Sequence, residues 1–224
     1  MKSGRLMASA VVKMLSGVIL MGLLLFLPAG SIRYWNAWLL IGALFIPMLF
    51  VGGVLVVKSP ELLQKRLNHK ETEKEQVQVV LVSAVLFVAS FLLAGFDYRL
   101  GWSHLPMWLV IVATVVFLAA YGIYVEVMRE NAYLSRTVEI QENQKVIDTG
   151  LYGIVRHPMY FATVLLFGAM PLVLGSLPAF LVLLPYPFIL AKRIRNEEQV
   201  LEKGLAGYTE YKKRVRYRIL PFIW

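Results

Sequence analysis

The sequence predicts an all-α, polytopic integral membrane protein with four full spans, a C-terminal helical hairpin and a cytoplasmic amphipathic tail. Its 224 residues are 58% hydrophobic, and the mean hydropathy is +0.65. A single soluble domain of this length does not need so much apolar side chain, whereas helices that face lipid do. The apolar residues also gather in stretches that can cross the roughly 30 Å hydrocarbon core, which takes about 20 helical residues.

Four stretches have the length of a full span: residues 8–27, 35–57, 77–95 and 106–128. The first follows basic residues, as a signal peptide would. It is long and lacks a clear small-residue cleavage site, so we expect it to be retained as a helix. Together these stretches make residues 1–128 the predicted transmembrane scaffold. The charged segment at about 58–76 is expected to hold a short interfacial helix, with Ser59 as its cap and Pro60 at its first position.

The distribution of Lys and Arg predicts the orientation. With the N-terminus in the cytoplasm and four crossings, all of the 23 basic residues except Arg33 and Arg99 fall on the cytoplasmic side. Excess Lys and Arg mark this side of a polytopic protein. The same bias accounts for the net charge of +9, and no nucleic-acid-binding motif accompanies it. Both termini are therefore expected in the cytoplasm, and nucleic acid is not expected as a partner.

The second predicted region, residues 129–224, is the catalytic half. It divides into three parts: a polar loop 129–157, a membrane hairpin 158–191 and a cytoplasmic tail 192–224. Because the loop and the tail flank one hairpin, both are expected to meet at its cytoplasmic mouth.

The hairpin itself is expected to be short. Each arm has only about 15 residues, near 22 Å, so it is tilted or does not quite cross. Pro171, Gly175 and Pro178 mark its turn. Pro185 and Pro187 are expected to kink its second arm.

The stretch "RHPMY" opens the hairpin. Pro158 suits the first helical position after a capping residue, here His157. The backbone N–H groups of that first turn favour an anionic group, and Arg156 can add a bidentate contact to a carboxylate or phosphate. The alternative is that Arg156 and His157 are anchors at the membrane interface.

In the tail, Arg193 and Glu197 are four residues apart and share one helix face,. The alternative interpretation is a surface ion pair of small effect. Glu197 and Glu198 project about 100° apart on a helix. One of them can therefore face the pocket while the other is expected to be solvated.

Several kinds of chemistry are excluded or not indicated. The sequence has no cysteine, which excludes disulfides, thiolate zinc sites, iron–sulfur clusters and thiol nucleophiles. His69, His104 and His157 lie in different loops, so no metal site is predicted. Nucleophile-elbow, P-loop and dinucleotide-binding motifs are absent.

The motifs of the catalytic half resemble the isoprenylcysteine carboxyl methyltransferase family. The resemblance rests on "DTGLYGIVRHPMY", "RIRNEEQVLE", "YTEYKKRV" and the terminal "LPF", which span roughly residues 137–222 in order. The related phospholipid N-methyltransferases share the RHPxY core. One position departs from the family pattern, because Ala162 stands where the family usually has glycine.

The resemblance implies an S-adenosylmethionine-dependent methyltransferase of the multi-pass type. The cofactor is expected at the cytoplasmic mouth under the tail, and S-adenosylhomocysteine is the product. Arg193 is implied as the residue that contacts the substrate. For an amine or thiol acceptor, Glu198 is the nearby candidate to accept a proton. The candidate cofactor-binding residues are Gln144, Lys145, Val146, Ile147, Tyr152, Arg156, His157, Pro158, Met159, Tyr160 and Glu197.

The favoured reaction is O-methylation of an isoprenylcysteine-type carboxylate on a lipid-like or prenylated small molecule, among membrane lipids and without an obligate protein partner. N-methylation of a phospholipid amine and S-methylation of a small thiol are alternatives within the same superfamily. The sterol C14-reductases carry a similar RHPxY region but use NADPH, and this chain is short for their larger set of spans. A non-enzymatic membrane scaffold or small transporter is the remaining alternative.

Overall fold

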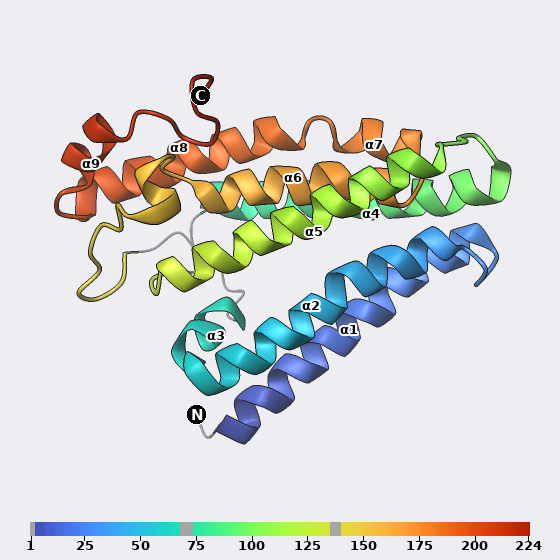
Figure 1. Cartoon of the computed structure of the whole chain (residues 1–224), viewed down its shortest axis with the longest axis horizontal. Helices are drawn as coiled ribbons and strands as arrows, with labels where there is room; N and C mark the ends of the chain where they lie inside the picture. The colour runs from blue at the N-terminus through green and yellow to red at the C-terminus, as the bar shows by residue number, and fades with distance from the viewer. Residues whose placement is uncertain (1–2, 68–73, 135–139) are drawn as a thin grey trace.

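In the computed structural model, residues 3–67, 74–134 and 140–224 are described, and within them every regular element is a helix. Figure 1 shows a bundle of long helices, with the short helices α3 and α9 at one end and the short helix α7 near the other. The elements are α1 (Ser3–Ala29), α2 (Trp35–Lys58), α3 (Pro60–Leu67), α4 (Lys74–Leu100), α5 (Met107–Glu130), the 3-10 turn η1 (Gly150–Gly153), α6 (Pro158–Val173), α7 (Leu177–Leu183), α8 (Tyr186–Gly204) and α9 (Tyr208–Arg214).

Among the described residues, five segments are long and apolar enough to cross a membrane: Gly4–Ala29, Trp35–Lys58, Gln76–Leu100, Met107–Glu130 and Leu177–Gly204. The first three contain the predicted spans 8–27, 35–57 and 77–95, and the fourth covers the predicted span 106–128 except for its first residue. The prediction of an all-α, multi-pass membrane protein is confirmed. The number of complete crossings and the side on which the termini lie stay predictions.

The predicted hairpin forms with unequal arms. Its first arm, α6, has only 16 residues, as the sequence indicated. At the turn Gly175 has a φ of +74°, and the Ser176 hydroxyl accepts a hydrogen bond from the Ala179 N–H at 3.2 Å. The second arm is interrupted around Pro185, between α7 and α8, because proline disrupts a continuing helix,. Helix α8 then runs without a break past residue 191, where the tail was expected to begin.

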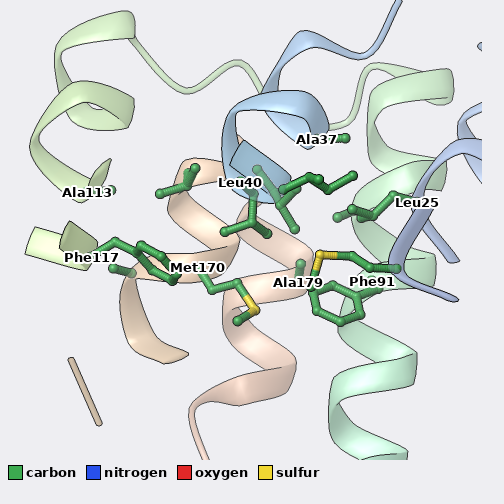
Figure 2. Close-up of a cluster of buried hydrophobic side chains, with 14 of the residues drawn as sticks. Leu25, Ala37, Leu40, Phe91, Ala113, Phe117, Met170 and Ala179 are labelled. Carbon is green, nitrogen blue, oxygen red and sulfur yellow. The ribbon is translucent and has the colours of Figure 1, made fainter. Parts of the chain in front are cut away.

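A close-packed core holds the two halves together away from the short elements. Leu25, Leu40, Phe117 and Met170 converge there from α1, α2, α5 and α6 (Figure 2). The helices approach closely where side chains are small. A Cβ on Gly95 of α4 would lie 2.6 Å from the Leu25 carbonyl oxygen of α1, which is the contact that small residues permit in membrane bundles.

This packing fixes the C-terminal end of α5 and the N-terminal end of α6, which the polar loop connects. Figure 1 shows α3, α9 and the segment around η1 at the end of the bundle where α1 starts, opposite the α1–α2 and α4–α5 turns. Helix α3 begins at Pro60 as predicted, and its Leu62 and Leu63 are buried. His69 lies outside the described residues.

Candidate active site

A pocket lies where the polar loop, the start of α6, the polar half of α8 and the tail meet. It contains Arg193 and every predicted cofactor-binding residue except Pro158, which begins α6 behind the lining. Its walls are formed by Asn131, Tyr133, Leu134, Gln144, Lys145, Val146, Ile147, Tyr152, Arg156, His157, Met159, Tyr160, Arg193, Glu197, Val200, Leu201, Leu205, Tyr208 and Tyr211. The sequence thus identified side chains that the fold brings together from three separate segments.

The "DTGLYG" turn places Tyr152 in the wall. Gly150 has a φ of +53°, and a Cβ there would lie 1.5 Å from a Glu130 carboxylate oxygen, so the position requires glycine. That carboxylate accepts a hydrogen bond from the Leu151 N–H at 3.1 Å. Asn131 then donates to the Tyr152 hydroxyl at 2.9 Å. The end of α5 therefore holds the turn through two consecutive side chains.

Helix α3 also contacts the loop. The Lys65 ammonium donates to the Gln141 side-chain oxygen at 2.5 Å. The Gln141 amide in turn donates to the Tyr133 carbonyl oxygen at 2.5 Å. These contacts join α3 to the segment that supplies Tyr133 and Gln144 to the pocket.

At the start of α6, His157 occupies the N-cap position and Pro158 the first helical position, as the sequence predicted. The two residues before Pro158 are also paired with the C-terminal segment. The Arg156 N–H donates to the Tyr217 carbonyl oxygen at 2.9 Å, and the His157 N–H donates to the Arg218 carbonyl oxygen at 2.8 Å. Backbone hydrogen bonds to residues 217 and 218 therefore hold the start of the "RHPMY" stretch in place.

The first polar network of α8, which we call the pocket network, consists of Arg193, Tyr160 and Glu197. Arg193 Nε donates to the Tyr160 hydroxyl at 3.0 Å. That hydroxyl donates to Glu197 Oε2 at 2.6 Å. All three residues line the pocket, so Arg193 and Glu197 do share a face, with Tyr160 between them.

The second network, which we call the anchor network, is centred on Glu198. Arg156 Nε donates to Glu198 Oε1 at 2.8 Å, and His157 Nε2 lies 3.2 Å from the same oxygen. Arg218 Nε donates to Oε2 at 2.9 Å. Arg156 Nη1 also donates to the carbonyl oxygens of Val215 and Arg216, both at 2.7 Å.

The expectation that the second acid of the pair is solvated is wrong. Glu198 is 2% exposed, because the paired C-terminal segment and the start of α6 cover it. It does not line the pocket. A carboxylate whose two oxygens are both held by cationic or imidazole groups is a poor proton acceptor. The role of Glu198 as a proton acceptor therefore stays a prediction, and this geometry does not favour it.

The tail forms the remaining wall. Helix α8 ends at Gly204, Gly207 has a φ of +83°, and α9 follows. An apolar cluster closes this side; it comprises Leu205, Tyr208, Tyr211 and Val215, packed by Ile140, Val146 and Leu201. The glycines thus fold the tail back over the loop instead of continuing one helix.

Three tyrosines of the wall are buried outside the apolar helices. Burial raises the pKa of Tyr152, Tyr208 and Tyr211 above the ordinary value of 10.0, so all three are neutral phenols at neutral pH. The Tyr211 hydroxyl donates to the Tyr152 carbonyl oxygen at 2.8 Å. The Tyr208 hydroxyl is buried without a hydrogen-bond partner among the described residues.

The sequence did not assign the wall residues Asn131, Tyr133, Val200 and Tyr211 to the site. Asn131 is a polar residue three positions after the predicted span 106–128, which was the available signal. The helical spacing of Leu201, Leu205 and Tyr208 indicates an apolar face. The spacing does not indicate that this face packs against Ile140 and Val146 of the loop. Among the described residues, no group of three His, Asp or Glu side chains is placed to hold a metal ion.

Comparison with known proteins finds a partial relative and a family model that matches part of the chain. The chain is 33% identical over 91 residues to Delta(14)-sterol reductase TM7SF2 of Mus musculus. That alignment covers 39% of this chain and 22% of the relative, so the chain spans about a fifth of the length of the curated relative it matches. Residues 109–203, from α5 to the end of α8, match the model of the isoprenylcysteine carboxyl methyltransferase (ICMT) family, which confirms the resemblance that the motifs indicated.

Proposed function

We propose that the chain is an S-adenosylmethionine-dependent membrane methyltransferase that acts on a lipid-like acceptor, with an isoprenylcysteine-type carboxylate favoured. The observation that carries the proposal is the convergence of the family's motif residues on one pocket within the matched segment. The family match supports the class of enzyme. The identity of the acceptor rests on the chemistry of the pocket.

The pocket's donor set fits the cofactor. S-adenosylmethionine supplies a methyl group on a sulfonium, and it also carries an ammonium, a carboxylate and ribose hydroxyls. The Tyr208 hydroxyl, which has no hydrogen-bond partner among the described residues, is a buried donor that a polar ligand atom would satisfy,. Glu197 can accept from an ammonium or a hydroxyl. The rings of Tyr152 and Tyr160 suit a sulfonium, and Val146 and Leu201 provide apolar contact for a base.

The pocket network can orient an acceptor. Arg193 is the cation of the pocket's α8 wall, and the Tyr160 hydroxyl, held between Arg193 and Glu197, fixes its direction. A guanidinium binds a carboxylate in a defined, bidentate geometry. Such alignment supplies most of the rate in an in-line displacement.

The proton balance favours a carboxylate acceptor. An ionised carboxylate forms a methyl ester without losing a proton, so the pocket needs no general base for it. An amine or thiol acceptor has to release a proton during the reaction. Glu198, the candidate for that role, has both oxygens engaged and lies outside the pocket lining. This supports O-methylation over N- and S-methylation.

The charge distribution supports an active site at the cytoplasmic leaflet with both termini on that side. Lys58, Lys65 and Arg129 lie at the helix ends that adjoin the polar loop. Arg33 and Arg99 are at the opposite ends of the spans. Positive charge at the pocket end is the arrangement expected for the cytoplasmic side.

The test is incubation of the purified protein with methyl-labelled S-adenosylmethionine, fractionated membrane lipids and prenylcysteine analogues. We expect label in the prenylcysteine fraction as a base-labile methyl ester. Arg193→Ala is expected to abolish labelling, whereas Lys192→Ala, at an exposed neighbouring position, keeps it. Stable label in phospholipid amines would replace the favoured acceptor with the N-methylation alternative.

The same preparation tests the other classes. The partial likeness to a sterol reductase predicts binding of NADPH in place of S-adenosylmethionine. A scaffold or transporter predicts binding of neither, with no effect of Arg193→Ala. Nicotinamide binding without S-adenosylmethionine binding, or no binding at all, would overturn the proposal.

A further inference from the structure

The last ten residues, 215–224, which we call the C-terminal strap, are joined to the pocket by backbone and side-chain contacts. The strap pairs with Arg156 and His157 through the carbonyl oxygens of Tyr217 and Arg218, at 2.9 and 2.8 Å. Its far end folds back, so that the Trp224 carbonyl oxygen accepts from the Arg218 N–H at 2.9 Å. The Arg218 guanidinium lies 5.1 Å from the centre of the Trp224 ring.

The strap also has an apolar contact with the helices under the pocket. Ile219 is buried in a cluster with Tyr160 of α6 and Tyr186, Leu190 and Ile194 of α8. Tyr160 is the middle member of the pocket network. Displacement of the strap would therefore loosen the packing behind a residue that contacts both Arg193 and Glu197.

Glu198 is the point at which these contacts meet. It joins α8 to the start of α6 through Arg156 and His157, and to the strap through Arg218. A buried carboxylate is strongly destabilising when its partners are removed, since its desolvation is then uncompensated. Glu198 does not line the pocket itself. It joins α8 and the residues before α6, which supply pocket-lining side chains, to the strap.

We propose that Glu198 is a positioning residue that anchors the C-terminal strap to the pocket wall, and that this anchoring, and not proton transfer at Glu198, sets the affinity for the cofactor. The inference rests on the proposed function for the identity of that cofactor. It accounts for the strap residue Arg218, to which neither the motifs nor the pocket lining give a role.

The experiment compares Glu198→Gln with two strap variants, Arg218→Met and Arg218→Lys. Arg218 is 27% exposed and outside the pocket, so its loss leaves Glu198 with Arg156 and the protein folded. Arg216→Met is the matched control, because Arg216 is an exposed arginine of the same strap. The measurements are calorimetric binding of S-adenosylmethionine, kcat, the pH profile of kcat/KM and hydrogen exchange of residues 215–224.

We expect Arg218→Met and Glu198→Gln each to weaken cofactor binding about tenfold, the loss typical of one hydrogen bond to a charged group. The double variant should be little worse than either one, since both remove the same anchor. Hydrogen exchange of the strap should rise in both, the pH profile should keep its shape, and Arg218→Lys should recover most of the affinity. Arg216→Met should match the wild type.

A lost pH limb in Glu198→Gln together with wild-type affinity in Arg218→Met would overturn the proposal, because that is the behaviour of a general base. Additive effects of the two substitutions would also overturn it. Absence of cofactor binding by the wild-type protein would instead overturn the proposed function. In that case hydrogen exchange still tests whether Glu198 anchors the strap. Unchanged exchange of residues 215–224 in both variants would refute the anchoring.

Discussion

The two networks of α8 begin at adjacent residues of the same type and reach different surroundings. Glu197 contacts the Tyr160 hydroxyl and lines the pocket. Glu198 is turned away, buried and held by Arg156, His157 and Arg218. The rotation of about 100° per residue in a helix is sufficient to separate them.

The difference shows how one helix can carry binding and anchoring without interference. In the pocket network a phenol stands between the cation and the acid, and all three side chains line the pocket. In the anchor network the acid is enclosed by its partners. A substitution in the first is expected to remove a ligand contact, and one in the second to loosen a wall.

The largest effect should follow from Glu197→Ala. Removing the acid of the pocket network deletes an acceptor for the cofactor and leaves the Tyr160 hydroxyl without its partner at 2.6 Å. We expect cofactor affinity to fall about 100-fold, equivalent to about 3 kcal/mol and at the upper end for a hydrogen bond to a charged group. Calorimetry with S-adenosylmethionine measures it.

The control on the same helix is Gln199→Ala, which changes an exposed side chain and should leave the affinity within about 0.5 kcal/mol of the wild type. If Glu197→Ala instead matched the smaller loss expected of Glu198→Gln and increased exchange in the strap, the separation of the two networks would be refuted.

Tyr208→Phe should have the next largest effect, and it separates binding from stability. The Tyr208 hydroxyl is buried without a partner among the described residues, so its removal strands no protein group. The free energy of unfolding should stay the same or rise by up to about 1 kcal/mol. Cofactor affinity should fall about tenfold if the hydroxyl donates to the ligand.

Thermal unfolding in detergent and calorimetry on one preparation give both values for Tyr208→Phe. Tyr211→Phe is the contrasting variant, because its hydroxyl donates to the Tyr152 carbonyl oxygen at 2.8 Å; it should lose stability as well. A loss of stability without a loss of affinity in Tyr208→Phe would show that this hydroxyl is structural.

Alkaline pH should lower the free energy of unfolding through the tyrosines of the pocket wall. Burial raises the pKa of Tyr152 and Tyr211 above 10.0. Below pH 10 both phenols are neutral whether the chain is folded or unfolded, so their contribution to stability is constant,. Above it, the unfolded chain loses protons that the folded chain keeps, and the free energy of unfolding falls as pH rises. Thermal unfolding from pH 8 to pH 11 should show a decline that is shallower in Tyr152→Phe.

The scaffold and the pocket differ in how far the sequence predicts them. Apolar length and charge bias located the four long spans, and the glycine and proline positions located the hairpin turn, because these signals act within a few residues. The pocket residues of the "RHPMY" and "RNEEQ" stretches were found through the family motifs. Spacing alone placed Arg193 and Glu197 on one face, but it did not reveal Tyr160 between them.

The burial of Glu198 could not be read in the same way. It depends on Arg218, which is distant in sequence and stands in the basic run "KKRVRYR", where every arginine has the same local surroundings. Only the pairing of residues 156 and 157 with 217 and 218 distinguishes that arginine. Contacts of this kind between loop and tail leave no periodic pattern.

The smallest effect is expected of Arg214→Gln. This variant tests whether the tail is held by buried ion pairs or by any ion pair, exposed ones included. Arg214 pairs with Asp148 of the loop, but the two side chains are 64% and 39% exposed. Such a pair contributes about 0–1 kcal/mol and is screened by salt. Cofactor affinity should therefore change by less than about twofold, and less still at about 0.5 M salt, whereas Arg218→Met, four positions further on, costs about tenfold. Equal losses in the two variants would mean that the enclosed carboxylate of Glu198 has no special part in holding the tail.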